Sequence, residues 1–87
     1  MLKKTIVLNK DARFHIRPVA RIVEKAMQFE SLICLSTETY IADCKSAISL
    51  MRIGRPTSGM VEIITEGIDE LDAMDEMEYT IKNMHWR

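Results

Sequence analysis

Hydrophobic and polar positions follow two different periods along this chain, and the changes between them mark its elements. Residues 2–8 contain the β-forming run Thr5-Ile6-Val7 and end at a turn-forming Asn-Lys-Asp, which predicts a first strand. Beyond Pro18, apolar residues recur every three or four positions, which predicts an amphipathic helix. The apolar positions of this helix are Val19, Ile22, Val23, Ala26 and Met27.

The middle of the chain predicts a hairpin followed by a short helix. Residues 31–36 and 39–43 are rich in strand-forming side chains and are separated by few residues. Ser46 stands where an N-cap is expected, because its side chain can accept a backbone N–H of the first helical turn. Gly54 stands where the helix would end in the left-handed conformation.

The last third predicts one more strand and one more helix. Residues 60–65 form a strand-like run that ends at Gly67. Asp69 is expected to cap a helix whose apolar positions again repeat every three or four residues. These positions are Leu71, Met74, Met77, Ile81 and Met84.

The predicted order of elements is β-α-β-β-α-β-α, which favours a two-layer α/β sandwich with one face of the sheet covered by helices. The sheet is expected to be antiparallel or mixed. A ferredoxin-like domain with an extra helix would give the same order. We expect the methionines on the helical stripes to lie in the core: Met27, Met74, Met77 and Met84.

Composition narrows the class of protein. Eighty-seven residues, 47% of them hydrophobic and 29% charged, predict a single folded domain over residues 1–87. No apolar run approaches the roughly 18 residues that a membrane span requires, and no secretory signal is visible, so a cytoplasmic location is expected. Cys34 and Cys44 are expected to be free thiols on opposite faces of the sheet.

The charges are unevenly divided. Residues 1–55 hold 10 Lys and Arg against 5 Asp and Glu, whereas residues 56–87 hold 2 against 8. Such a division usually reflects solvated faces, but the basic half could also attract an acidic partner or a phosphate.

The most informative stretch for chemistry is Phe14-His15-Ile16-Arg17-Pro18. Pro18 suits the first turn of a helix, which places His15 at the start of that helix. The N–H groups and dipole there attract anions and disfavour a charged imidazole. A neutral ring beside Arg17 suits a phosphohistidine, but a structural histidine and a solvated arginine fit the same spacing.

Several features together resemble one family. His15-Ile16-Arg17-Pro18, Lys45-Ser46, a short apolar helix ending at Gly54, Gly59 in the next loop, and Gly67-Ile68-Asp69-Glu70 at the last helix resemble HPr, the histidine-containing phosphocarrier of the bacterial phosphoenolpyruvate-dependent sugar phosphotransferase system. The resemblance covers nearly the whole chain. It implies an open-faced β-sandwich, with a four-stranded antiparallel sheet and three helices on one face.

The resemblance also implies a function and its partners. The histidine matching His15 takes a phosphoryl group from phosphorylated enzyme I and gives it to a sugar-specific enzyme IIA, assisted by the arginine matching Arg17. Such a protein is a carrier without turnover of its own, and it needs no metal, nucleotide or other cofactor. Neither nucleic-acid binding nor membrane insertion is expected. His85 has no second ligand at metal spacing and, with Trp86 and Arg87, predicts a frayed helix end.

Ser46 has two open roles. One is that of a simple N-cap. The other follows from the resemblance: in many family members the matching serine is phosphorylated by HPr kinase/phosphorylase, which slows transfer and creates a partner for a catabolite-control transcription factor. A regulatory protein acting through Ser46, or a relay that does not serve sugar transport, is therefore the alternative to a sugar carrier.

The resemblance further implies a docking surface on the short second helix. Ile48 and Met51 would form its apolar patch, with Arg52 and Arg55 at the rim facing an acidic partner. The alternative is that Met51 belongs to the core and the arginines are solvated.

The residues around the histidine depart from the family pattern. Phe14, Ile16 and Val19 are larger than the residues usual there, which predicts a bulkier site and altered transfer or partner choice. Arg13 replaces a small residue and would add positive charge.

Overall fold

The computed structural model describes residues 1–86, and the elements follow the predicted order. The strands are β1 (Leu2–Val7), β2 (Leu32–Ser36), β3 (Ile41–Asp43) and β4 (Met60–Glu66). The helices are α1 (Ile16–Ala26), α2 (Ala47–Met51) and α3 (Glu70–Lys82).

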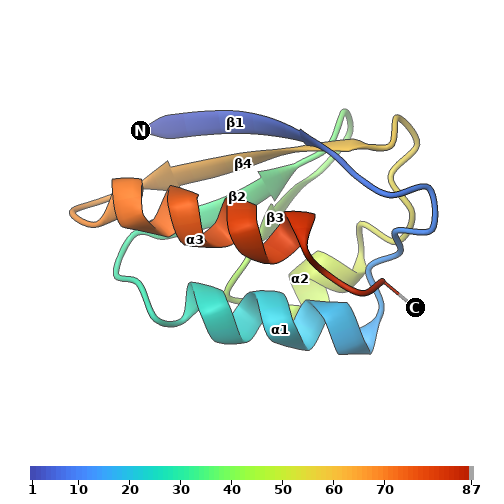
Figure 1. Ribbon diagram of the computed structural model, residues 1–87, viewed down its shortest axis with the longest axis horizontal. Helices are drawn as coiled ribbons and strands as arrows, with labels where there is room; N and C mark the ends of the chain where they lie inside the picture. The colour runs from blue at the N-terminus through green and yellow to red at the C-terminus, as the bar shows by residue number, and fades with distance from the viewer. Residues whose placement is uncertain (87) are drawn as a thin grey trace.

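The strands form one antiparallel sheet in the order β1-β4-β2-β3. Figure 1 shows all three helices on the same side of this sheet, which leaves the other face uncovered. The fold is therefore the open-faced α+β sandwich with a four-stranded antiparallel sheet that the resemblance to HPr implies, and the pattern of elements alone had left a mixed sheet open. The predicted hairpin is the β2–β3 pair, in which Leu35 lies opposite Ala42.

The alternation of side chains along the strands separates the core from the open face. Ile33 and Leu35 on β2 and Val61 and Ile63 on β4 are at most 1% exposed. The alternate positions, which include Cys34, face away from the helices and are partly or fully exposed.

The two cysteines follow the same rule. Cys34 pairs with Asp43 on the open face, whereas Cys44 is one position further along and lies buried in the core. Both are free thiols, as predicted. Burial raises the pKa of the Cys44 thiol, which keeps it protonated and unreactive.

The helical stripes fill the remaining half of the core, with two exceptions. Val19 and Ile22 of α1 and Met77 of α3 are fully buried, as the periodicity predicts. The prediction that Met27 is a core residue is wrong: its side chain is 63% exposed because α1 ends at Ala26, one residue earlier. Leu71 is likewise 65% exposed.

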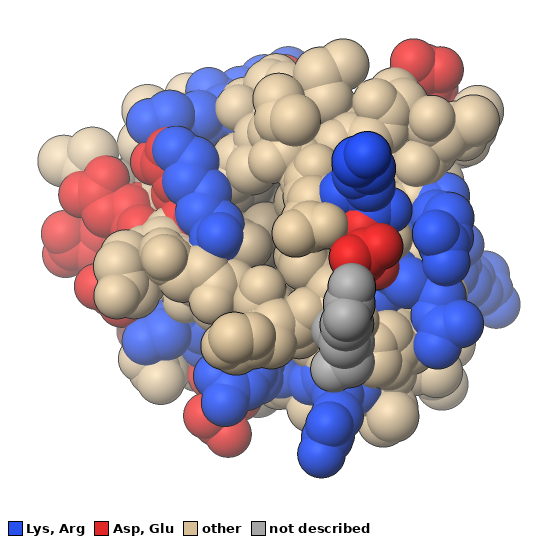
Figure 2. Space-filling view, turned by 45° about the vertical axis from the view of Figure 1, so that its right-hand side comes forward, with Lys and Arg blue, Asp and Glu red and all other residues tan. Residues whose placement is uncertain are grey.

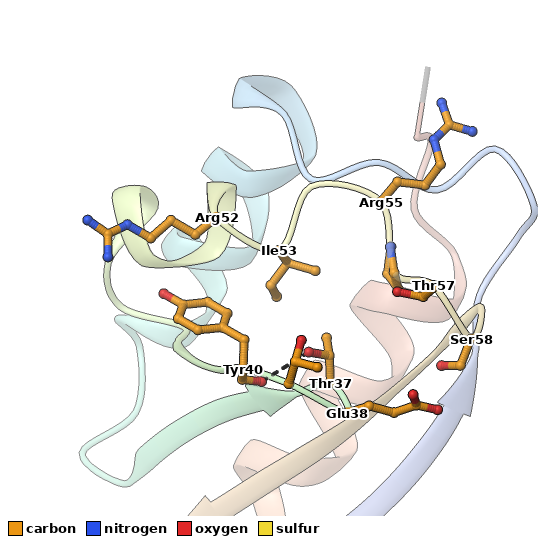
Figure 3. A pocket seen from close by; sticks show the side chains of 10 residues that line it. Thr37, Glu38, Tyr40, Arg52, Ile53, Arg55, Thr57 and Ser58 are labelled. Carbon is orange, nitrogen blue, oxygen red and sulfur yellow. Dashed lines mark hydrogen bonds between the residues drawn. The ribbon is translucent and has the colours of Figure 1, made fainter.

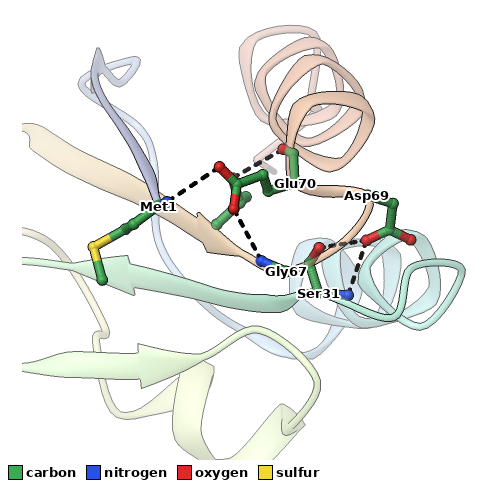
Figure 4. A network of polar contacts seen from close by, with 6 residues as sticks. Met1, Ser31, Gly67, Asp69 and Glu70 are labelled. Carbon is green, nitrogen blue, oxygen red and sulfur yellow. Dashed lines mark hydrogen bonds and ion pairs between the residues drawn. The ribbon is translucent and has the colours of Figure 1, made fainter.

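The start of α3 is held by its own acidic residues (Figure 4). Asp69 occupies the N-cap position, but its carboxylate makes no cap and instead accepts hydrogen bonds from the N–H groups of Glu30 and Ser31 and from the Ser31 hydroxyl. Ser31 also lies so close to Gly67 that a Cβ there would come within 2.7 Å of the Ser31 Cα. Glycine at this position is therefore required by contact as well as by its φ of 150°.

Candidate functional site

His15 is the N-cap residue of α1, with an extended backbone (φ −112°, ψ −179°). Two backbone hydrogen bonds hold the loop that precedes His15. The Phe14 N–H donates to the carbonyl of Gly54 (2.7 Å), and the His15 N–H donates to the carbonyl of Arg13 (3.0 Å). Gly54, with φ of 61°, follows α2 and so links this helix to the histidine loop. The predicted position of His15 at the start of a helix is confirmed.

One nitrogen of the His15 ring is held by the C-terminal segment. Nε2 lies 2.8 Å from the backbone carbonyl oxygen of Trp86. A carbonyl oxygen can only accept, so Nε2 carries the proton and donates it. In a neutral ring, Nδ1 then keeps an unshared electron pair.

The prediction of a frayed end is wrong for Trp86. Its side chain is only 6% exposed, and its ring packs on that of Phe14, with centroids 4.9 Å apart and planes tilted by 60°. His85 is exposed, and Arg87 lies outside the described residues. The helical period stops at the end of α3, so no pattern in the sequence indicated that the segment folds back onto Phe14.

The surroundings of His15 are more positive than negative. The hollow beside its ring is lined, among the described residues, by Asp11, Arg13, His15, Arg55 and Trp86. In Figure 2, which brings this end of the molecule forward, lysine and arginine side chains lie around the face. Sequence reasoning assigned Arg55 to the edge of the docking surface and did not associate Asp11 or Trp86 with His15.

Arg17 lies in the first turn of α1 and is exposed. That turn contains no acidic residue, and the His15 side chain makes no capping hydrogen bond. The N–H groups at the start of α1 therefore have no carboxylate of their own turn beside them, and a phosphoryl group on the adjacent ring would meet both these donors and Arg17.

The large residues around His15 do not crowd it in the way the sequence suggested. Phe14 and Val19 are 2% and 0% exposed, so both side chains belong to the core. Only Ile16, at 63% exposed, adds bulk to the surface next to the histidine.

Ser46 is the N-cap of α2, and its hydroxyl accepts a hydrogen bond from the Ser49 N–H at 3.2 Å. The capping role is therefore present. The hydroxyl belongs to a half-buried residue, and α2 is a short helix of five residues.

The surface of α2 carries exposed apolar side chains. Ile48 is 70% and Met51 42% exposed, whereas Leu50 is fully buried and supplies the core contact of the helix. The alternative that Met51 belongs to the core is wrong. Arg52 and Arg55 are both exposed, and Ile16 adds a third large apolar side chain on α1, the helix against which α2 packs.

A small cleft separates the loop after α2 from the β2–β3 hairpin (Figure 3). Arg52 and Arg55 extend away from it in different directions, and the Tyr40 hydroxyl is already bonded to the carbonyl and hydroxyl of Ser49. The two arginines therefore do not converge on a ligand in this cleft, and the Tyr40 hydroxyl already has partners within the fold.

Two further features do not occur among the described residues, namely a metal-binding cluster and a membrane-spanning helix. Within residues 1–86, no three His, Cys, Asp or Glu side chains are grouped so as to hold a metal ion. None of the helices in this range has the length and apolarity that a bilayer-spanning segment requires.

Comparison with known proteins agrees with this arrangement. Residues 2–83 match the model of the family described as the PTS HPr component phosphorylation site. The phosphocarrier protein HPr of Treponema pallidum is 32% identical over 83 residues, which covers 95% of this chain and 94% of that protein. The HPr-like protein Crh of Halalkalibacterium halodurans is 29% identical over 77 residues, 88% of this chain and 92% of that protein.

Solved structures agree as well. The crystal structure of HPr from Thermoanaerobacter tengcongensis superposes with a TM-score of 0.83 at 28% identity, covering 93% of this chain and 91% of that one. The family match spans the strand, loop and helix that build the histidine site. The chain belongs to the HPr family of phosphocarrier proteins of the phosphotransferase system.

Proposed function

We propose that this protein is a phosphocarrier that accepts a phosphoryl group on His15 from phosphorylated enzyme I and passes it to a sugar-specific enzyme IIA. The observation that carries the proposal is the hydrogen bond from His15 Nε2 to the Trp86 carbonyl at 2.8 Å. It leaves Nδ1 as the unprotonated nitrogen of a ring that stands at a helix N-terminus. The carrier acts in the cytoplasm as a single domain over residues 1–87.

The bonds that form and break in the transfer step involve only the His15 ring and the phosphoryl donor. The electron pair of Nδ1 forms a bond to phosphorus while the bond from phosphorus to the donor atom of enzyme I breaks, and that bond's electron pair leaves with the donor. Nε2 keeps its proton throughout. The return step to enzyme IIA is the same displacement with another acceptor, so the carrier has no turnover of its own and requires no cofactor.

The charge that arrives on His15 is met by fixed positive groups. The N–H groups at the start of α1 and the Arg17 guanidinium provide donors within the same turn. Arg13 and Arg55 line the hollow beside the ring and add positive potential. Asp11 in the same hollow opposes this effect, and the arginines outnumber it.

The exposed face of α2 supports a docking role. Ile48 and Met51 offer apolar area, and Arg52 and Arg55 offer positive charge that suits an acidic surface on enzyme I or enzyme IIA. The hydrogen bond from Phe14 to Gly54 couples the loop after α2 to the histidine loop, so a partner bound on α2 is held close to His15.

The experiment is intact-mass measurement after incubation with enzyme I, phosphoenolpyruvate and magnesium. The wild-type protein is expected to gain one acid-labile phosphoryl group, and His15→Ala is expected to gain none while its circular dichroism spectrum stays unchanged. His85→Ala is the matched control, because it removes the other, exposed histidine. Equal phosphorylation of His15→Ala and the wild-type protein would refute the assignment.

A second candidate function is regulation through a phosphate on Ser46. Two observations favour it: the similarity to an HPr-like protein Crh, and the position of Ser46 at the N-terminus of α2. A phosphate there would add roughly two negative charges close to the proposed docking face. This regulatory function requires a cognate kinase and a transcription-factor partner. Ser46→Asp should then change the rate of transfer or the binding of that partner, and no change in either would remove this candidate.

A further inference from the structure

The C-terminal segment beyond α3 is fixed at the phosphoryl site by an aromatic pair. Trp86 is 6% exposed and packs on Phe14, which is itself 2% exposed, with ring centroids 4.9 Å apart. His85, between α3 and Trp86, is exposed, so only the second of these two neighbouring side chains is buried. The burial of two large aromatic rings shows that the segment is anchored, and that its anchor is the residue immediately before His15.

This anchor determines where the backbone of Trp86 lies. The carbonyl oxygen of Trp86 accepts the Nε2 proton of His15, 71 positions away along the chain. Phe14 is held in turn by its N–H bond to Gly54. The ring of His15 is thus oriented by a main-chain acceptor whose position depends on the indole of Trp86.

The hydrogen bond changes in strength during the reaction. Before transfer, the Nε2–H of a neutral imidazole donates to the carbonyl. Once Nδ1 has bonded to phosphorus and the bond to the donor atom has broken, the ring has given up its electron pair and carries a positive charge shared with Nε2–H. A charged donor forms a stronger hydrogen bond than a neutral one, so the carbonyl stabilises the phosphorylated ring more than the free ring.

We propose that Trp86 is a positioning residue for phosphoryl transfer: its indole, packed on Phe14, places its own carbonyl to hold the Nε2 proton of His15 and to stabilise the charge that the ring acquires. The inference rests on the proposed function of His15. It assigns to the segment after α3 a role that depends on the aromatic side chain of Trp86, whereas a residue of any type would supply a backbone carbonyl.

The experiment compares Trp86→Ala with Trp86→Phe and with the neighbouring control His85→Ala. The first measurement is the ¹H–¹⁵N spectrum of the His15 ring. In the wild-type protein, Trp86→Phe and His85→Ala, the Nε2 proton should give a resonance protected from exchange with water. In Trp86→Ala this resonance should be lost to exchange, which a purely structural role of the indole away from the site would not cause.

The second measurement is the rate and equilibrium of phosphoryl transfer from enzyme I. Trp86→Ala should lower both by about five- to ten-fold, which corresponds to the difference between a neutral and a charge-assisted hydrogen bond. Trp86→Phe should restore most of the loss, and His85→Ala should transfer at the wild-type rate. The maximal rate should fall more than the KM for enzyme I rises. The reason is that the hydrogen bond to the Trp86 carbonyl involves Nε2 and not Nδ1, the nitrogen that reacts with the phosphoryl group of enzyme I.

A chemical variant keeps the test valid if Trp86→Ala loosens the fold. Semisynthesis can replace the amide between residues 86 and 87 by an ester, whose carbonyl is a weaker acceptor, without changing either side chain. The ester protein should show the same direction of change in exchange and in transfer. Transfer at the wild-type rate in both Trp86→Ala and the ester protein would overturn the inference and leave the carrier function intact. Absence of transfer in the wild-type protein would instead refute the proposed function itself.

Discussion

The helices α1 and α3 begin in opposite ways, although their backbone dipoles are alike. α1 begins after His15 and has no acidic residue in its first turn, whereas α3 begins after Asp69 and has Glu70 and Asp72 in its first turn. Acidic residues near a helix N-terminus interact favourably with the helix dipole and so favour folding. The first turn of α1 forgoes this stabilisation and leaves its positive end available to an incoming anion.

Two acidic residues at the start of α3, Asp69 and Glu70, are engaged in the fold. Asp69 accepts bonds from Glu30 and Ser31, and Glu70 accepts from the Gly67 N–H at 3.0 Å and the Met1 amino group at 3.1 Å. Hydrogen bonding from Ser31 and then from Glu30 lowers the pKa of Asp69, and bonding from Gly67 lowers that of Glu70. One helix start therefore serves stability, and the other serves chemistry at His15.

Placing an acidic residue in the first turn of α1, as in α3, should have the largest effect on phosphoryl transfer. Arg17→Glu removes a donor to the phosphoryl group and adds a repelling charge, so the rate of phosphoryl acceptance should fall by about 100-fold. The same change should raise the free energy of unfolding by about 0.3–1 kcal/mol, because a glutamate in the first turn suits the dipole. Transfer assays and urea unfolding measure the two effects.

The control is Arg21→Glu, which changes the net charge equally at an exposed position one turn further along α1. It should reduce the transfer rate only slightly. A loss as large as that of Arg17→Glu would mean that overall charge, and not the local arrangement at the helix start, governs the reaction.

Removing the charge at the start of α3 should affect stability alone. Asp69→Asn cannot accept all the hydrogen bonds that the carboxylate accepts, so the free energy of unfolding near pH 7 should fall. Because the pKa of Asp69 is lowered in the folded state, its stabilisation is present above the pKa of an unfolded aspartate and is lost as pH falls through the folded value. The variant should therefore lose less stability than the wild-type protein in acid.

Urea unfolding at about pH 7 and about pH 3 tests this prediction. Asp75→Asn, at an exposed position further along α3, is the matched control and should behave like the wild-type protein at both pH values. If Asp69→Asn shows the same acid sensitivity as the wild-type protein, the carboxylate does not stabilise this end as described.

Ser46 at the start of α2 should give the smallest effect, because it contributes one capping bond to a helix of five residues. Ser46→Ala should lower the free energy of unfolding by about 1 kcal/mol. Thr57→Ala, in an exposed loop, is the hydroxyl control and should change stability little. Equal stability of Ser46→Ala and the wild-type protein would show that the cap has no energetic role.

The order and type of the elements could be predicted from sequence because local rules determine them. The period of the apolar residues located α1 and α3, and Ser46 marked the start of the short α2. The predicted end of α2 at Gly54 is wrong, because the helix ends at Met51 and Arg52 is its C-cap, although Gly54 does have a positive φ. The same rules failed just outside the elements. Met27 continues the period of α1 but lies beyond its last residue, and Asp69 has the sequence of a cap but bonds to another loop.

The site could be predicted in part for the same reason. His15 and Arg17 are near neighbours, so a helix start brings them together without knowledge of the fold. The contribution of Trp86 depends on its contact with Phe14, a residue far from it in the sequence, and no local sequence pattern indicates such a contact. Phe14 shows the limit most directly: its size suggested a crowded site, whereas its burial makes it the anchor of the C-terminal segment.

The most direct test of this account is to determine which nitrogen of which histidine carries the phosphoryl group. The protein, labelled with ¹⁵N, would be phosphorylated by enzyme I and phosphoenolpyruvate and examined by ¹⁵N and ³¹P NMR. The account predicts phosphorus bonded to Nδ1 of His15, with the proton retained on Nε2 facing the Trp86 carbonyl. Phosphorus on Nε2 of His15, or on His85, would contradict it.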